Sequence, residues 1–175
     1  MPNKLFVISG ASGVGKSTLA SSLARYFAGR GLRTVLIDGD IGLRCADLML
    51  DVQDRVVFDL GDVKEQLCPT EQALIRPTGT ENLFLLAAPQ MLRPSDIKAK
   101  EISKLIEKLS ADHDIILLDA PAGIDAGFRL AARFCDRVIL VTGADPAAIR
   151  DASRASDALE AMGKKNVRMV INRVN

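Results

Sequence analysis

The residues of this chain most able to do chemistry lie in a glycine-rich segment near its beginning. Gly10-Ala-Ser-Gly-Val-Gly-Lys-Ser17 fits the pattern G-x-x-x-x-G-K-[ST], which is typical of a phosphate-binding loop. Glycines let such a loop curl until its backbone N–H groups point at phosphate oxygens. Lys16 would neutralise the β- and γ-phosphates, and the Ser17 hydroxyl would coordinate Mg²⁺. The expected nucleotide-binding residues of the loop are Gly10, Ala11, Ser12, Gly13, Val14, Gly15, Lys16 and Ser17.

Carboxylates follow two other apolar runs. Asp38 and Asp40 come after Val35-Leu-Ile37, and Asp119 comes after Ile115-Ile-Leu-Leu118. The carboxyl ends of strands line the ligand crevice of an open α/β sheet, so we expect these groups to converge near the phosphate loop. Asp38 and Asp119 would then lie on the Mg²⁺ side, and Asp40 would orient the attacking water. Gly123 follows in a loop whose amide could contact the γ-phosphate, although it could also be a simple turn glycine.

Composition and missing patterns exclude several other classes of protein. There is no G-x-G-x-x-G dinucleotide fingerprint and no G-x-S-x-G nucleophile elbow. The three cysteines are far apart, and the single histidine, His113, is expected to be a solvated turn residue. A net charge of +1 argues against a dedicated nucleic-acid binder. The absence of N-K-x-D favours adenine over guanine.

Strand-like and helical segments alternate along the chain, which predicts an α/β fold. Its expected form is a doubly wound, mainly parallel sheet with helices on both faces, in a single domain over residues 1–175. Expected strands cover 5–9, 34–37, 83–86, 115–118, 138–141 and 167–171. Expected long helices cover 17–28, 95–109 and 146–162, with short helical candidates at 47–50, 59–66 and 71–75. No apolar run approaches the roughly 18 residues of a membrane span, so we expect a cytoplasmic protein.

Three segments together resemble one known family. They are Ser9-Gly-Ala-Ser-Gly-Val-Gly-Lys-Ser-Thr18, Val35-Leu-Ile-Asp-Gly-Asp-Ile-Gly-Leu-Arg44 and Leu118-Asp-Ala-Pro-Ala-Gly-Ile124. They are similar to the MinD/ParA ATPases, which have a deviant phosphate loop. The middle segment resembles the MinD branch, because plasmid-partition relatives usually have Asp-Pro-Gln after the second aspartate.

The resemblance implies a P-loop ATPase that uses ATP, ADP and Mg²⁺ and regulates the placement of the division site. Such proteins form an ATP-dependent face-to-face homodimer, bind the inner face of the membrane, recruit a division inhibitor and respond to an activating partner. By position, Thr18 joins the phosphate loop, and Asp40 matches the water-positioning aspartate. Asp119 matches the aspartate on the Mg²⁺ side. Asn172, followed by Arg173, matches a residue near the base.

The chain departs from the family pattern in three places. Ala11 stands where the family has a signature lysine that reaches the partner's γ-phosphate, so we expect ATP binding to be kept and turnover to be slow. Cys45 replaces a usual asparagine and is expected to be a partly buried small residue. The chain ends at Asn175, so we expect it to lack the family's C-terminal portion, and membrane binding would require the amphipathic tail found there.

Other functions on the same scaffold stay open from the sequence. One is a regulator of flagellar number or of another polar structure, which differs only in its partners. Another is a biosynthetic enzyme similar to dethiobiotin or cobyrinate amide synthetases, in which the absence of a signature lysine is expected. Residues 126–175 contain nine Lys and Arg against five Asp and Glu. We expect this excess to be a solvated surface, so nucleic acid is not an expected partner.

Overall fold

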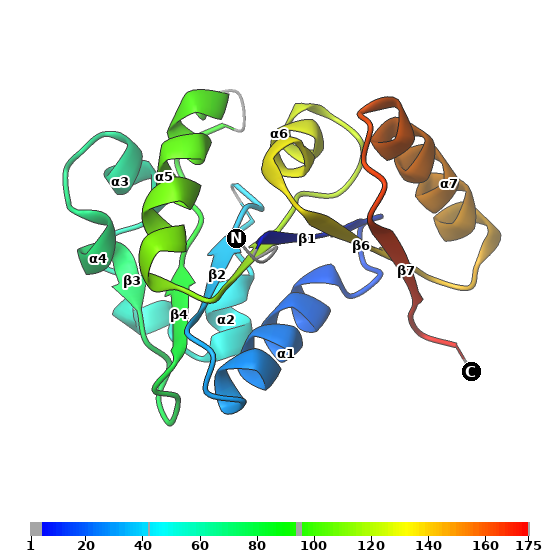
Figure 1. The fold of residues 1–175 in the computed structure, drawn as a ribbon. Helices are drawn as coiled ribbons and strands as arrows, with labels where there is room; N and C mark the ends of the chain where they lie inside the picture. Colours follow the sequence, from blue (N-terminus) through cyan, green and yellow to red (C-terminus); the bar gives the residue numbers. More distant parts are fainter. Residues whose placement is uncertain (1–4, 42, 94–95, 175) are drawn as a thin grey trace.

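The computed structural model describes residues 5–41, 43–93 and 96–174, in which seven strands form one sheet (Figure 1). The strand order is β3-β4-β2-β5-β1-β6-β7, and only β3 runs antiparallel to its neighbour in this part of the chain. The strands are β1 (Leu5–Gly10), β2 (Thr34–Asp38), β3 (Leu74–Ile75), β4 (Leu83–Leu86), β5 (Ile115–Asp119), β6 (Arg137–Thr142) and β7 (Val167–Ile171). The helical elements are α1 (Lys16–Gly29), α2 (Ala46–Leu50), the 3₁₀ turn η1 (Gln53–Arg55), α3 (Leu60–Lys64), α4 (Thr70–Ala73), α5 (Ala99–Asp112), α6 (Ala126–Phe134) and α7 (Pro146–Ala161).

Helices cover the two faces of the sheet in separate layers. Alternate strand residues point to opposite faces, so Val35 and Ile37 join one core while Leu36 joins the other. The first core packs against α5, α6 and α7, and the second packs against α1 and α2 (Figure 1). Burial on both faces explains why the central strands are continuous aliphatic runs. The expected fold class is confirmed.

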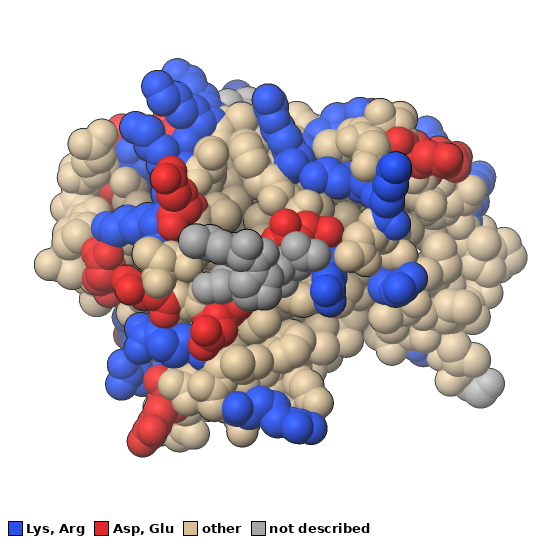
Figure 2. All heavy atoms as spheres, in the orientation of Figure 1, with Lys and Arg blue, Asp and Glu red and all other residues tan. Residues whose placement is uncertain are grey.

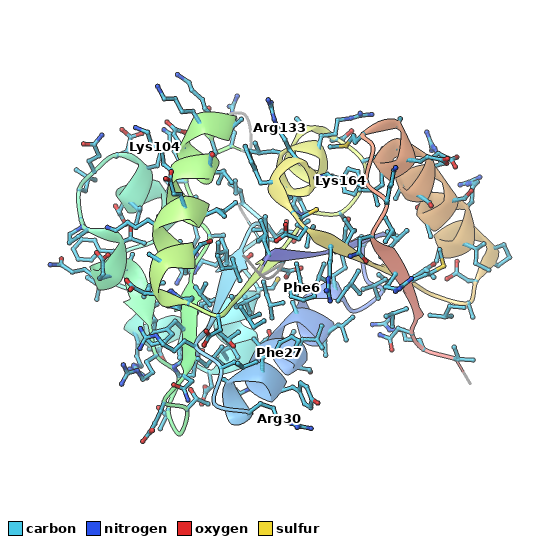
Figure 3. All side chains as sticks on the ribbon, viewed as in Figure 1. Phe6, Phe27, Arg30, Lys104, Arg133 and Lys164 are labelled. Atoms are coloured by element: carbon cyan, nitrogen blue, oxygen red, sulfur yellow. The ribbon has the colours of Figure 1, made fainter. Side chains whose placement is uncertain are left out.

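Two contacts show how the helices are held, one joining α1 to the sheet and one joining the end of α7 to the end of α6. Phe27 of α1 lies on Phe6 of β1, with ring centroids 6.0 Å apart (Figure 3). The ammonium of Lys164, at the end of α7, donates to the backbone carbonyls of Arg133 and Cys135 at 2.9 and 3.1 Å. These bonds satisfy carbonyls at the C-terminal end of α6, which have no partner within that helix.

The expected elements are present, with changes at their ends and three additions, η1, β3 and α6. All six expected strands form, and the short candidate at 71–75 divides into α4 and the two-residue strand β3. Helix α6 was not expected. Its buried side is Phe128, Ala131 and Ala132, and Leu130 and Phe134 pack against the same core, so this short helix has a clear apolar face. The expected start of a helix at Ser95 lies outside the described residues, and α5 begins at Ala99.

The expectation for His113 was wrong. Its side chain is buried at the end of α5, where Nδ1 lies 3.0 Å from the carbonyl oxygen of Leu109. The ring packs edge-on against Phe84 at a centroid distance of 5.2 Å. The neighbouring aspartates made the position look solvated, but the helix ends with this residue turned toward the sheet. Burial lowers the pKa of His113, which favours the neutral ring.

Replacing Phe128 by alanine should lower the free energy of unfolding by about 3–5 kcal/mol, because a fully buried ring between α6 and the sheet is lost. Equilibrium urea denaturation measures the change. Tyr26, which is 55% exposed on α1, gives the matched control, and Tyr26→Ala should cost less than about 1 kcal/mol. Equal losses in the two variants would contradict the core role of α6.

Candidate nucleotide-binding site

The glycine-rich loop joins the end of β1 to the start of α1, as the sequence predicts. Gly15 caps α1 in a left-handed conformation with φ of +97°. No side chain caps this helix end, and its first turn has no acidic residue. The first N–H groups of α1 therefore face outward without an intrahelical acceptor, which suits an anion such as phosphate.

Lys16 lies across this loop. Its side chain is buried, and its ammonium donates a hydrogen bond to the backbone carbonyl of Ala11 at 3.0 Å. The ammonium group of Lys16 is thus held against the backbone of the loop. A triphosphate that enters the loop would meet both this ammonium and the helix N–H groups. Ser17 is half-buried and Thr18 is exposed, next to Lys16 at the start of α1.

Two of the glycines cannot be replaced without moving their surroundings. A Cβ on Gly10, where φ is +148°, would lie 2.0 Å from the carbonyl oxygen of Val141. A Cβ on Gly15 would lie 2.5 Å from Nδ2 of Asn172. The loop is therefore packed tightly against the ends of β6 and β7.

Asn172 connects the end of β7 to the phosphate loop. Its Nδ2 donates to the backbone carbonyl of Val14 at 2.9 Å, and its own N–H donates to the carbonyl of Thr142 at 2.8 Å. The resemblance implied a position near the base, and the structure places Asn172 beside the loop that would hold the phosphates. Arg173 follows it, exposed and with φ of +56°.

Asp38 and Asp119 end neighbouring strands and lie side by side. β2 and β5 pair in parallel with Asp38 opposite Asp119, and Asp119 is also opposite Ile8 of β1. Both side chains are almost wholly buried. This confirms the expectation that the two strand ends meet beside the loop that follows β1.

The two carboxylates have different partners. Oδ1 of Asp38 accepts from the N–H of Asp40, and Oδ2 accepts from the N–H of Ala46, both at 3.0 Å. Asp38 is therefore the anchor of the loop between β2 and α2. Neither oxygen of Asp119 has a hydrogen-bond partner of ordinary length in the described part of the chain. Of the two, Asp119 has its oxygens free for a ligand.

Burial makes ionisation of both groups costly. It raises the pKa of Asp119 to about 7, with the Ser17 hydroxyl and the Lys16 ammonium opposing the shift and the negative charge of Asp38 adding to it. It raises the pKa of Asp38 to about 6 against the two backbone hydrogen bonds. Asp40 is half-buried, and burial raises its pKa while Lys16 lowers it.

The buried carboxylate of Asp119, with the Ser17 hydroxyl beside it, fits a divalent cation. Among the described residues, no group of three or more His, Cys, Asp or Glu is placed to hold a metal ion. Mg²⁺ commonly keeps several waters and takes one or two carboxylates together with phosphate oxygens, so this sparse set suits it. Ser17 and Asp119 are the residues that would hold it here.

Ala11 lines an open hollow beside the loop. The hollow has a volume of about 460 Å³ and is also lined by Gly123, Asp125 and Arg154. Gly123 and the phosphate loop thus face the same space, as expected. Arg154, on α7, was not among the predicted site residues, because its spacing from Asp151 is that of ordinary charged residues on a helix surface.

Cys45 lies at the start of α2 and is half-buried, as expected. Burial raises the pKa of its thiol, and the carboxylates of Asp38 and Asp40 add to the effect. The thiol is therefore protonated at neutral pH and is a poor nucleophile.

A family model described as "ParA: NUBPL iron-transfer P-loop NTPase" matches residues 1–174. The chain belongs to this ParA family of P-loop NTPases. No helix of its described residues is long and apolar enough to cross a membrane.

Within the ParA family the chain is similar to several proteins named MinD. It is 38% identical over 173 residues to the septum site-determining protein MinD of Synechocystis. The matched residues make up 98% of this chain and 65% of that protein. The MinD of an Aquifex aeolicus MinC:MinD complex matches with a TM-score of 0.89 and 35% identity, over 98% of this chain and 69% of that one. The MinD of Pyrococcus horikoshii, solved with Mg-ADP, matches with a TM-score of 0.86 and 25% identity, over all of this chain and 72% of that one.

Replacing Asp119 by asparagine should stabilise the nucleotide-free protein at pH 8 and help less at pH 5. The pKa of Asp119 is higher in the folded protein than its ordinary value of 3.8, so folding takes up a proton between these two pKa values. Ionised Asp119 therefore opposes folding above pH 7, and this cost disappears as the pH falls toward 4. We expect a gain in Tm of about 3 °C or more at pH 8.

Thermal unfolding at the two pH values measures this effect. Asp157, an exposed carboxylate on α7, provides the control, and Asp157→Asn should leave Tm almost unchanged at both. A loss of Tm in Asp119→Asn at pH 8 would show that the ionised carboxylate stabilises the fold, contrary to this account.

Proposed function

We propose that this chain is the nucleotide-binding part of a MinD-type ATPase, a molecular switch that acts in placing the division site. The observation that carries the proposal is the buried Asp119, whose oxygens are not bonded to the backbone, beside Ser17 and a complete phosphate loop. Similarity to MinD proteins over nearly all of this chain supports the biological role. The chain spans about two thirds of the length of these relatives, so their whole activity is carried over only as part of this proposal.

The proposed switch binds ATP or ADP through the loop. The N–H groups at the start of α1 and the Lys16 ammonium would hold the phosphates, and the nucleotide would displace the carbonyl of Ala11 as partner of Lys16. Mg²⁺, when bound, would neutralise phosphate charge and fix the geometry of the terminal phosphate. Ser17 and Asp119 would hold it, with Asp38 keeping the neighbouring loop in place.

Asp40 is the proposed residue for orienting the attacking water. It follows the end of β2, its N–H is fixed by Asp38 at 3.0 Å, and its charge lies near enough to Lys16 to be favoured by it. A carboxylate in this place can accept a hydrogen bond from the attacking water without touching the phosphates. Gly123, on the far side of the hollow beside Ala11, is the proposed contact for the γ-phosphate.

Ala11 makes slow turnover part of the proposal. Its methyl group supplies no charge at the side of the loop where the family has a lysine, so less of the transition-state charge is balanced. Binding depends on Lys16 and the helix N–H groups and would be retained. Two subunits would close face to face over two ATP molecules, and this dimer would bind a division inhibitor, as in the complex of the Aquifex relative with MinC. The proposed location is cytoplasmic.

The solution mass should double with Mg²⁺ and a non-hydrolysable ATP analogue and stay monomeric with Mg-ADP. The reason is that a γ-phosphate is needed to bridge two facing loops. Light scattering coupled to gel filtration measures the mass. Lys16→Ala, which removes the cation of the loop, should stay monomeric in both nucleotides. A wild-type mass that stays monomeric although the analogue is bound would contradict the dimeric switch and favour a biosynthetic enzyme.

Ala11→Lys should raise the ATP turnover of the dimer about tenfold or more, because one cation returns to the γ-phosphate. Steady-state phosphate release at saturating ATP measures it. Ala161→Lys, which adds the same charge on an exposed position of α7, is the control and should change nothing. If Ala11→Lys and Ala161→Lys have the same rate, the lysine position plays no part in turnover here.

A further inference from the structure

A second hollow lies at the opposite end of the sheet from the phosphate loop. It has a volume of about 480 Å³ and lies between β3, β4, α4 and the last turn of α5. Arg33 comes just before β2 and His113 just before β5, so these lining residues mark the amino ends of the strands. Figure 2 shows a small group of Lys and Arg side chains at the lower left of the molecule, with Asp and Glu side chains next to it. The nucleotide site follows the carboxyl ends, so the two sites cannot share a ligand.

Phe84 lines this hollow, and two positively charged side chains lie against its ring. The guanidinium groups of Arg33 and Arg76 each lie 5.2 Å from the centre of its ring, which is itself buried. Arg55 and Lys108 also line the hollow. Four basic side chains against two acidic ones, Glu71 and Asp112, give the lining a net charge of +2, whereas the whole chain carries +1.

Only part of this charge has a partner in the protein. Lys108 pairs with Glu71 at 3.0 Å. Arg33 donates from Nε to the backbone carbonyl of Asp112 at 2.7 Å, which leaves its two terminal nitrogens available. Arg76 lies over the ring of Phe84 and has neither a hydrogen bond nor an ion pair with any described residue. The two like charges near one ring repel each other, and an anion bound in the hollow would lower that cost.

We propose that this hollow is a second anion site, which binds the phosphoryl group of a small molecule. A guanidinium presents a planar fork of N–H donors that matches phosphate oxygens, and three arginines from separate segments line this hollow, namely Arg33, Arg55 and Arg76. The hollow has the volume of a small-ligand pocket, and Phe84 behind the guanidinium groups holds them in place. A compact anion with several oxygens fits this arrangement better than an extended acidic peptide. The proposal does not depend on the function assigned to the nucleotide site.

Inorganic pyrophosphate titrated into the protein saturated with Mg-ADP tests the site, because the phosphate loop is then already filled. Isothermal calorimetry should show one further binding event, which weakens as salt is raised. Arg76→Gln should weaken it at least tenfold. Arg25→Gln, which removes an exposed charge on α1 away from the hollow, should bind as the wild type does. Both variants should keep the Tm and the Mg-ADP affinity of the wild type.

Three results would overturn the proposal. One is the absence of any second binding event at millimolar pyrophosphate. Another is equal weakening by Arg76→Gln and Arg25→Gln, which would indicate general charge attraction. The last is a short Glu-rich peptide that binds in the same titration while pyrophosphate does not, which would make the hollow a contact surface for an acidic protein segment. Pyrophosphate binding that Arg76→Gln selectively weakens, with the peptide inert, supports the phosphoryl site.

Discussion

The structure depends on two carboxylates held side by side out of water. Parallel pairing of β2 with β5 puts Asp38 and Asp119 opposite each other, next to the strand that leads into the phosphate loop. Their burial raises the pKa of both groups, which means that the nucleotide-free fold bears an electrostatic cost at this edge. Lys16 nearby and the N–H groups at the start of α1 offset only part of it. A cation at Asp119 would offset the rest, so the same feature that weakens the empty protein prepares it to bind Mg²⁺ with a nucleotide.

The aliphatic layers are what make this arrangement possible. Each central strand is covered on both faces. The strand ends are therefore fixed in register, and the carboxylates that follow them stay buried. Asp38 fixes the loop after β2 by accepting hydrogen bonds from the N–H groups of Asp40 and Ala46. Asn172, after β7, fixes the phosphate loop by donating a hydrogen bond to the carbonyl of Val14. The site is therefore assembled from four strand ends and one helix start. The opposite end of the sheet has arginines around Phe84, so the sheet separates the nucleotide site from a hollow whose lining carries a net charge of +2.

Much of this arrangement could be predicted from the sequence, because the phosphate loop and the aspartates are tied to strand ends. A long apolar run followed by Asp119 has few other placements in a parallel sheet. What could not be predicted depends on contacts between distant segments. His113 is buried because Phe84 packs against it, and Arg154 lines the same hollow as Ala11 only after α7 has packed on the sheet. Nor did the sequence distinguish Asp38, whose oxygens are bonded to the backbone, from Asp119, whose oxygens are not.

The most direct test of the account is the number of protons released when Mg-ADP binds at pH 7. Calorimetry in two buffers of different ionisation enthalpy measures it. Because the pKa of Asp119 is raised to about 7, a cation bound there should displace a proton from a large share of the molecules. We predict a clear release that becomes much smaller in Asp119→Asn and when EDTA replaces Mg²⁺. The same proton count in wild type, in Asp119→Asn and in EDTA would contradict the claim that this buried carboxylate is the place where the metal binds.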